Sequence, residues 1–150
     1  LMKTEPSTFG IDHLAKAPKK TTGWDGVRNF QARNMLRDEM KRGDEAFLYH
    51  SSTDVPGIAG IVEIVKEGYP DPTAFERGHH HYDPDSDPAE PRWFMVDVRL
   101  KRKFSRVITL EELRRHEKKQ LKEMVLLRRG NRLSITPVSD AEWRFILSLE

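Results

Sequence analysis

The feature that most constrains the fold is a run of β-branched and small apolar residues at positions 57–66. Such a run is typical of a strand, and Gly57 and Gly60 within it mark a bulge or a close approach of two backbones. Four further segments have strand character: one ending at Met2, and residues 45–51, 93–100 and 132–137. The expected helices are short: residues 11–17, 29–40 and 121–127, and two that begin at the capping boxes of Thr109 and Ser139. About five strands with short peripheral helices predict an α+β domain on a small, curved, mixed sheet or barrel.

The length of 150 residues predicts a single domain over positions 1–150. The absence of cysteine excludes a disulfide scaffold, a thiolate zinc site and a cysteine nucleophile. It fits a reducing compartment, and we expect a cytoplasmic protein, nucleoid-associated in a bacterium or nuclear in a eukaryote. Apolar Leu1 and Met2 run directly into Lys3, so we expect no signal peptide and a start inside a strand. No apolar run is long enough to predict a transmembrane helix.

Residues 68–92 form one long tract with loop composition, because five prolines interrupt it. A structureless tract of this length is unusual in a compact domain. We interpret it either as a functional lid or as a poorly ordered excursion.

Charge is distributed unevenly along the chain. Residues 99–132 hold 13 basic and 4 acidic residues, a net charge of +9, whereas residues 63–98 hold 3 and 9, a net charge of −6. A charged run is most often a solvated helical face, but the basic stretch continues through the loop-like residues 128–132, where arginine beside Gly130 is well placed to meet phosphate. No wide apolar face accompanies these cations, so nucleic acid is favoured over a membrane.

Catalytic motifs are weak. His50 precedes Ser51, and Asp54 lies near, but adjacency in sequence does not make a triad. The chain contains neither a nucleophile-elbow motif nor a phosphate-cradling glycine loop. His79, His80 and His81 form one metal-like cluster, which we interpret as an exposed polar loop tip with adventitious nickel or zinc binding.

The tryptophans differ in context. Trp143 fits the apolar stripe of the last helix and is interpreted as core packing. Residues 21–26 are rich in turn-forming residues and predict a loop with Trp24 in its middle. Trp24 lies there between Gly23 and Asp25-Gly26, which are not typical core neighbours. An indole presented beside polar groups suits a flat, hydrogen-bonding ligand such as a nucleobase, although a simple surface turn remains an equal alternative.

Several segments resemble the EVE domain family. The resemblance spans nearly the whole chain and is carried by Met2-Lys3-Thr4-Glu5-Pro6, Trp24-Asp25-Gly26-Val27-Arg28-Asn29-Phe30-Gln31-Ala32-Arg33-Asn34, Phe47-Leu48-Tyr49-His50-Ser51, Pro56-Gly57-Ile58-Ala59-Gly60, Tyr69-Pro70-Asp71, Pro91-Arg92-Trp93, Met95-Val96-Asp97-Val98 and Arg132-Leu133-Ser134-Ile135. Thr4 stands where the family commonly has Ser, and Phe30 where it has Tyr, so a hydroxyl is kept at the first position and lost at the second.

The resemblance implies a PUA-like fold, a small and mostly β pseudo-barrel with short helices around it. It also implies a domain that reads modified bases, notably modified cytosine in DNA, by taking the base out of the stack. Carried over to this sequence, Trp24 is a wall of the pocket, and the remaining pocket residues are Lys3, Thr4, Asp25, Arg28, Asn29, Tyr49, His50, Ser51, Trp93 and Ser134.

We therefore expect a non-catalytic nucleic-acid-binding module without a cofactor or metal. The expected phosphate-binding residues are Arg99, Lys101, Arg102, Arg128, Arg129 and Arg132. One alternative is an RNA-binding PUA-like accessory protein that uses the same pocket. A second alternative, from another class, is a metal-dependent hydrolase that uses His50 or the three consecutive histidines.

Overall fold

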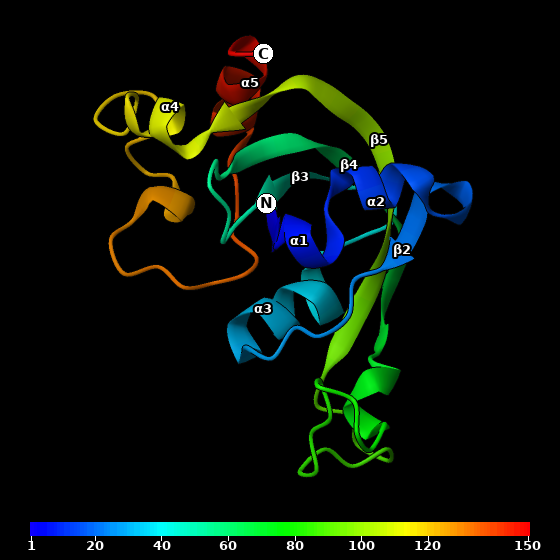
Figure 1. Cartoon of the computed structure of the whole chain (residues 1–150). Coiled ribbons are helices and arrows are strands. Elements are labelled where there is room, and N and C mark those ends of the chain that lie inside the picture. Colours follow the sequence, from blue (N-terminus) through cyan, green and yellow to red (C-terminus); the bar gives the residue numbers. More distant parts are fainter.

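The computed structural model describes residues 1–150, which form one curled mixed sheet with short helices around it (Figure 1). The strands lie in the order β1-β3-β4-β5-β2, and only the β1–β3 pair is parallel. Their bounds are β1 (Met2–Thr4), β2 (Thr21–Gly23), β3 (Glu45–His50), β4 (Gly57–Pro70) and β5 (Phe94–Thr109). The expected α+β fold on a small, curved, mixed sheet is confirmed, and the sheet forms a half-barrel.

The two long strands β4 and β5 carry the curl. Their pairing shifts register at four points, and bulges of this kind bend a strand and increase its twist. Gly57 and Gly60 sit where the backbones of β4 and β5 approach closely, since a Cβ atom at either would lie 2.4 Å from a carbonyl oxygen of β5. The close approach predicted at these two glycines is therefore present.

The helices are short and lie around the sheet. They are α1 (Pro6–Phe9), α2 (Ile11–Lys16), α3 (Phe30–Asn34) with a continuing π-helical turn η2 (Met35–Glu39), α4 (Leu110–Arg114) and α5 (Asp140–Ser148), together with the 3-10 turns η1 (Pro18–Lys20), η3 (Pro72–Phe75) and η4 (Val125–Leu127). The Thr109 and Ser139 hydroxyls each accept the amide three residues on, at 3.1 Å. The full capping box forms only at Ser139, whose amide donates to the Glu142 carboxylate, because the Glu112 carboxylate pairs with Arg106 instead. None of these helices is both long and apolar enough to cross a membrane.

The core consists of two clusters on opposite faces of the sheet. Side chains alternate along a strand, so Ala46 and Leu48 of β3 join one cluster while Phe47 and Tyr49 join the other. Trp24 belongs to the first cluster. Trp24 and Tyr49 are therefore separated by the sheet.

Several expectations about the elements were wrong. The first strand was expected to end at Met2 but begins there and ends at Thr4. Residues 21–23 were expected to be a loop but form β2, which pairs antiparallel with β5 through Thr22 and Val98. Residues 132–137 were expected to be a strand, but only an isolated bridge joins Ile135 to Met2. Because β1 is only three residues long, it offers too short an edge for a further full strand. The sheet thus has five strands because β2 is present in place of the strand expected at residues 132–137.

The proline-rich tract is reduced to a loop over residues 71–93, because its first residues extend β4. The loop closes on itself through the Asp71 amide, which donates to the Trp93 carbonyl at 2.9 Å. It projects from the far end of the β4–β5 pair (Figure 1). The segment 121–127, expected to be a helix, contributes only η4.

Candidate functional site

Trp24 directly follows β2 and borders a hollow. Its amide donates to the Val96 carbonyl of β5 at 2.7 Å, and its side chain packs in the core with only 8% of the residue exposed. The same residue lines a hollow of about 340 Å³ together with Phe9 and Asp25. The remaining lining residues are Thr8, Thr22 and Gly23. Trp24 is therefore a core residue that also borders an opening.

The polar ends of β1 and β3 hold the wall formed by α1. The Thr4 hydroxyl donates to the Phe9 carbonyl at 2.6 Å, and His50 Nε2 accepts the Ile11 amide at 3.1 Å. Ser51 donates to the Thr4 carbonyl from its amide, at 2.8 Å, and from its hydroxyl, at 3.3 Å. Thr4, His50 and Ser51 are thus brought together, but they position α1 and α2 and do not line the hollow.

These hydrogen bonds also bear on the alternative that the protein is a hydrolase. Burial lowers the pKa of His50 and so favours the neutral imidazole, whose Nε2 accepts the Ile11 amide. The Ser51 hydroxyl donates to a backbone carbonyl instead of to His50. No Ser–His nucleophile and base pair forms between these neighbours.

Lys3 and Ser134 meet through the backbone, since the Lys3 amide donates to the Ser134 carbonyl at 2.8 Å. Burial lowers the pKa of Lys3. Neither residue lines the hollow beside Trp24. Tyr49 lies in the opposite core cluster, where burial raises its pKa. The structure therefore does not bring Tyr49 together with Trp24.

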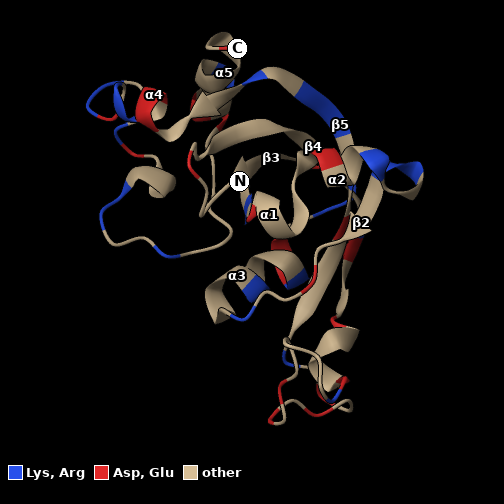
Figure 2. Cartoon of the chain, in the orientation of Figure 1, with Lys and Arg blue, Asp and Glu red and all other residues tan.

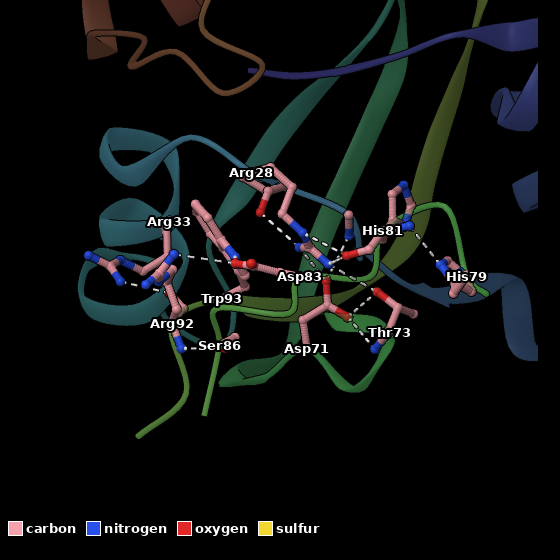
Figure 3. Close-up of polar contacts among 12 residues, drawn as sticks. Arg28, Arg33, Asp71, Thr73, His79, His81, Asp83, Ser86, Arg92 and Trp93 are labelled. Atoms are coloured by element: carbon pink, nitrogen blue, oxygen red, sulfur yellow. Dashed lines mark hydrogen bonds and ion pairs between the residues drawn. The ribbon is translucent and has the colours of Figure 1, made fainter. Parts of the chain in front are cut away.

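Arg28 fastens the segment after Trp24 to the 71–93 loop (Figure 3). Its Nη1 lies 3.0 Å from Oδ2 of Asp71, and its Nε and Nη2 donate to the His81 carbonyl at 3.1 and 2.7 Å. Asp71 is fully buried and also accepts the Gly26 amide at 2.8 Å and the Thr73 hydroxyl at 2.6 Å. Burial alone would raise the pKa of Asp71, but the hydrogen bonds from Thr73, Gly26 and Arg28 hold it below its usual range.

Asn29 and Trp93 also have structural partners. Asn29 caps α3, because its side-chain oxygen accepts the Ala32 amide at 3.0 Å. Trp93 Nε1 donates to the Asp83 carboxylate at 2.6 Å, and the indole stacks on Phe30 with ring centroids 4.8 Å apart. Trp93 does not line the hollow beside Trp24, although the guanidinium of Arg28 lies 5.5 Å from the centroid of its ring.

Phe30 presents an exposed aromatic face that the sequence reasoning missed. The residue is 52% exposed, and the guanidinium groups of Arg33 and Arg92 lie 4.9 and 5.9 Å from its ring centroid. One signal was available in the sequence, because Phe30 and Arg33 are three residues apart in a predicted helix and so share a face. The position of Arg92 beside the Phe30 ring depends on how the 71–93 loop folds.

The predicted phosphate-binding residues fall into two groups. Arg99 and Lys101 of β5 pair with Glu63 and Glu45 at 3.1 Å, and Arg102 pairs with Glu150. The other three are exposed in the loop after η4 and make no ion pair: Arg128, Arg129 and Arg132. Figure 2 shows basic residues along the curve of β5 and in that loop, whereas acidic residues gather in the 71–93 loop.

The three consecutive histidines also lie in the 71–93 loop. One ring nitrogen from each of His79, His80 and His81 falls within 4.8 Å of the other two. Only His80 is exposed, whereas its two neighbours are half-buried. These are the residues of the chain that could hold a metal ion.

Comparison with known proteins points to one family. The EVE domain family model matches residues 1–149. Human thymocyte nuclear protein 1 is 50% identical over 165 aligned residues, which cover 100% of this chain and 72% of the human protein. The crystal structure of human THYN1 protein in complex with DNA containing 5-methylcytosine superimposes with a TM-score of 0.94 at 49% identity, covering 99% of this chain and 94% of that one. A Pseudomonas putida protein superimposes with a TM-score of 0.93 at 44% identity, over 99% of this chain and 97% of its own.

Proposed function

Because this chain belongs to the EVE domain family, we propose that it is a non-catalytic nucleic-acid-binding module that reads a modified base. The base, a modified cytosine in DNA, is taken out of the stack and bound beside Trp24. Two facts support this proposal. One is the hollow beside the indole, and the other is a relative of nearly the same structure that has been crystallised with DNA containing 5-methylcytosine.

The hollow carries the proposal because its size and lining suit one heterocycle. Its volume of about 340 Å³ lies at the lower end of the roughly 300–1,000 Å³ of small-molecule sites. Its lining includes two aromatic residues, Trp24 and Phe9, and three polar ones, Asp25, Thr8 and Thr22. Stacking of a base on an aromatic ring contributes about 1–3 kcal/mol, which offsets much of the few kcal/mol needed to extrude the base.

The threonine hydroxyls replace two of the polar contacts expected from the sequence. Asn29 is committed to capping α3, and Arg28 to Asp71 and His81. In the proposed complex, Asp25, Thr8 and Thr22 read the polar edge of the base, while Arg28 and Asn29 fix the segment that carries Trp24. Thr4, His50 and Ser51 hold the opposite wall.

The phosphate backbone is proposed to contact the basic residues of β5 and the loop after η4. Arg128, Arg129 and Arg132 can bind phosphate without giving up an ion pair, so they contribute most. Arg99, Lys101 and Arg102 bind only in competition with their glutamate partners. The binding constant is then expected to fall steeply with salt, because phosphate contacts release counterions.

Selectivity for a methyl group is expected to be modest. One buried methyl group contributes about 0.8 kcal/mol, which corresponds to about a fourfold difference in Kd. A larger ratio requires the hollow to close tightly around the methyl group.

The test is a binding panel with single- and double-stranded DNA and RNA, each with and without 5-methylcytosine, at two salt concentrations. We expect the tightest binding to DNA that contains the modified base. Trp24→Phe and Asp25→Asn should abolish the preference and leave most of the non-specific binding. Trp143→Phe is the matched control, because it makes the same aromatic exchange away from the hollow.

Two outcomes would overturn the proposal. An unchanged preference in both hollow variants would remove the hollow from recognition. Tighter binding to RNA than to any DNA would favour the RNA-binding accessory reading. The compartment remains a prediction: several relatives are named nuclear proteins, and for this chain we expect the compartment that holds the DNA.

A further inference from the structure

The three consecutive histidines are gathered by the backbone, not merely adjacent in sequence. The His79 amide donates to the Glu76 carbonyl at 3.0 Å, and the Tyr82 amide donates to the His79 carbonyl at 2.9 Å. Gly78 enters this turn at φ +86°, a conformation that favours glycine. As a result the ring centroids of His80 and His81 lie 3.8 Å apart, and that of His79 lies 4.6 and 5.0 Å from them.

One buried nitrogen of the cluster has no partner. His81 Nδ1 is buried and makes no hydrogen bond. A buried polar atom without a partner is uncommon in folded proteins and calls for an explanation, such as an ion that occupies the position. A metal ion bound to Nδ1 would satisfy it.

His81 is also held in place before any ligand arrives (Figure 3). Its carbonyl accepts two hydrogen bonds from Arg28, and its ring lies so close to Gly26 that a Cβ atom there would be 2.3 Å from the ring. A ligand on a fixed scaffold loses less entropy on binding than one on a free loop tip. The arrangement is therefore unlike a solvated polar tip.

The surroundings of the cluster favour a cation. Residues 76–90 contain five acidic residues and one arginine, a net charge of −4. Arg28, which contacts the His81 carbonyl, is balanced by the buried carboxylate of Asp71 at 3.0 Å. A divalent ion would thus enter an acidic part of the surface.

From these observations we propose that His79, His80 and His81 bind one divalent transition metal ion, with zinc as the first candidate. Neutral imidazole is a preferred ligand of zinc, copper and nickel. Zinc–nitrogen bonds are about 2.0–2.1 Å long, so side-chain rotations must draw the three nitrogens together from their present spacing. The exposed face at His80 leaves the fourth position open to water. This site is separate from the hollow beside Trp24 and does not rest on base reading.

One existing hydrogen bond must be exchanged for the metal. His79 Nδ1 accepts the His81 amide at 3.0 Å, so a neutral His79 carries its proton on Nε2. Metal binding through either nitrogen of His79 displaces that bond. The His81 amide is therefore a direct reporter of occupancy.

The experiment is a titration of the full chain with ZnCl2, followed by isothermal titration calorimetry and by amide NMR spectra. We expect one zinc ion per chain, a large shift of the His81 amide resonance and a higher Tm at saturating zinc. Cobalt(II) should give visible absorption bands of tetrahedral coordination. Replacing His80 with alanine should weaken binding roughly tenfold or more, because one of three ligands is lost.

The variants separate a built site from unspecific binding. His80→Ala removes an exposed side chain, so its folding is not in question. The triple variant H79A/H80A/H81A should lose saturable binding, whereas His116→Gln, which changes a single histidine elsewhere, should not. Unchanged affinity in the triple variant, no saturable binding in the parent, or one ion per two chains would each overturn the proposal.

Discussion

Arg28 Nη1 lies 3.0 Å from Oδ2 of Asp71, a carboxylate with no exposed surface, across 43 residues of chain. This ion pair joins the segment that carries Trp24 to the loop over residues 71–93. Asp71 also accepts hydrogen bonds from Gly26 and Thr73, so both oxygens of the carboxylate have partners. The position of Trp24 beside its hollow thus depends on a contact far away in sequence.

Asp71→Ala is expected to lower the free energy of unfolding by about 3 kcal/mol, because it leaves Arg28 and the Gly26 amide without their buried partner. Urea denaturation measures the change. Asp85→Ala is the control, since it removes the same charge from an exposed position in the same loop and should cost less than about 0.5 kcal/mol. Equal losses in the two variants would contradict the role given to the buried pair.

His50 is expected to make stability depend on pH. Burial lowers the pKa of His50 in the folded state, so the unfolded chain binds the proton more readily. Its contribution is complete above the unfolded pKa of about 6.5 and is lost as pH falls through the folded pKa. Glutamine at this position can accept the Ile11 amide without titrating. As the pH falls from 7.5 to 5.5, the free energy of unfolding should therefore decrease more for the parent than for His50→Gln. Equal decreases in the two proteins would contradict this reasoning.

Arg129→Ala with Arg132→Ala is expected to weaken binding to all DNA sequences alike. Each lost phosphate contact reduces the slope of log K against log salt by about 0.9, so the double variant should flatten it by nearly twice that amount. Electrophoretic mobility shifts at several salt concentrations measure the slope. Lys118→Ala with Lys119→Ala removes an equal charge outside the proposed contact and should change the slope less. A loss confined to one sequence would exclude a phosphate role.

Trp143→Ala is expected to cost about 3 kcal/mol of stability and to leave the preference for a modified base intact. Trp143 stacks on Phe47 with ring centroids 4.0 Å apart, on the face of the sheet opposite to Trp24. Thermal unfolding gives the first quantity, and the binding panel at a temperature where the variant is folded gives the second. A binding defect in the fully folded variant would show that this face contributes to recognition.

Much of the fold followed from local patterns. The β-branched run at residues 57–66 lies within β4, and the predicted N-cap residues Thr109 and Ser139 begin α4 and α5. The motifs around Trp24 indicated the family over nearly the whole chain. These features depend on residues a few positions apart, because strand propensity and helix capping act within one or two turns of backbone.

The tertiary structure decided what no local pattern specifies. Residues 21–23 became a strand because β5 offered them a partner, whereas residues 132–137 found only the short edge of β1. Strand register determined which predicted site residues lie on the same face of the sheet. It placed Tyr49 on the opposite face from Trp24.

The same holds for the side chains of the site. Arg28 and Asn29 were predicted from the sequence to contact the base. In the structure Arg28 pairs with the carboxylate of Asp71, and Asn29 accepts the Ala32 amide of α3. Arg99 and Arg129 are indistinguishable as residues in a basic stretch, yet only the first has a glutamate beside it. The sequence by itself indicated the three longer strands, the capped starts of α4 and α5, and the family. The folded chain decided which charges are paired and which remain free, because pairing depends on atoms that meet only after long segments of chain have closed.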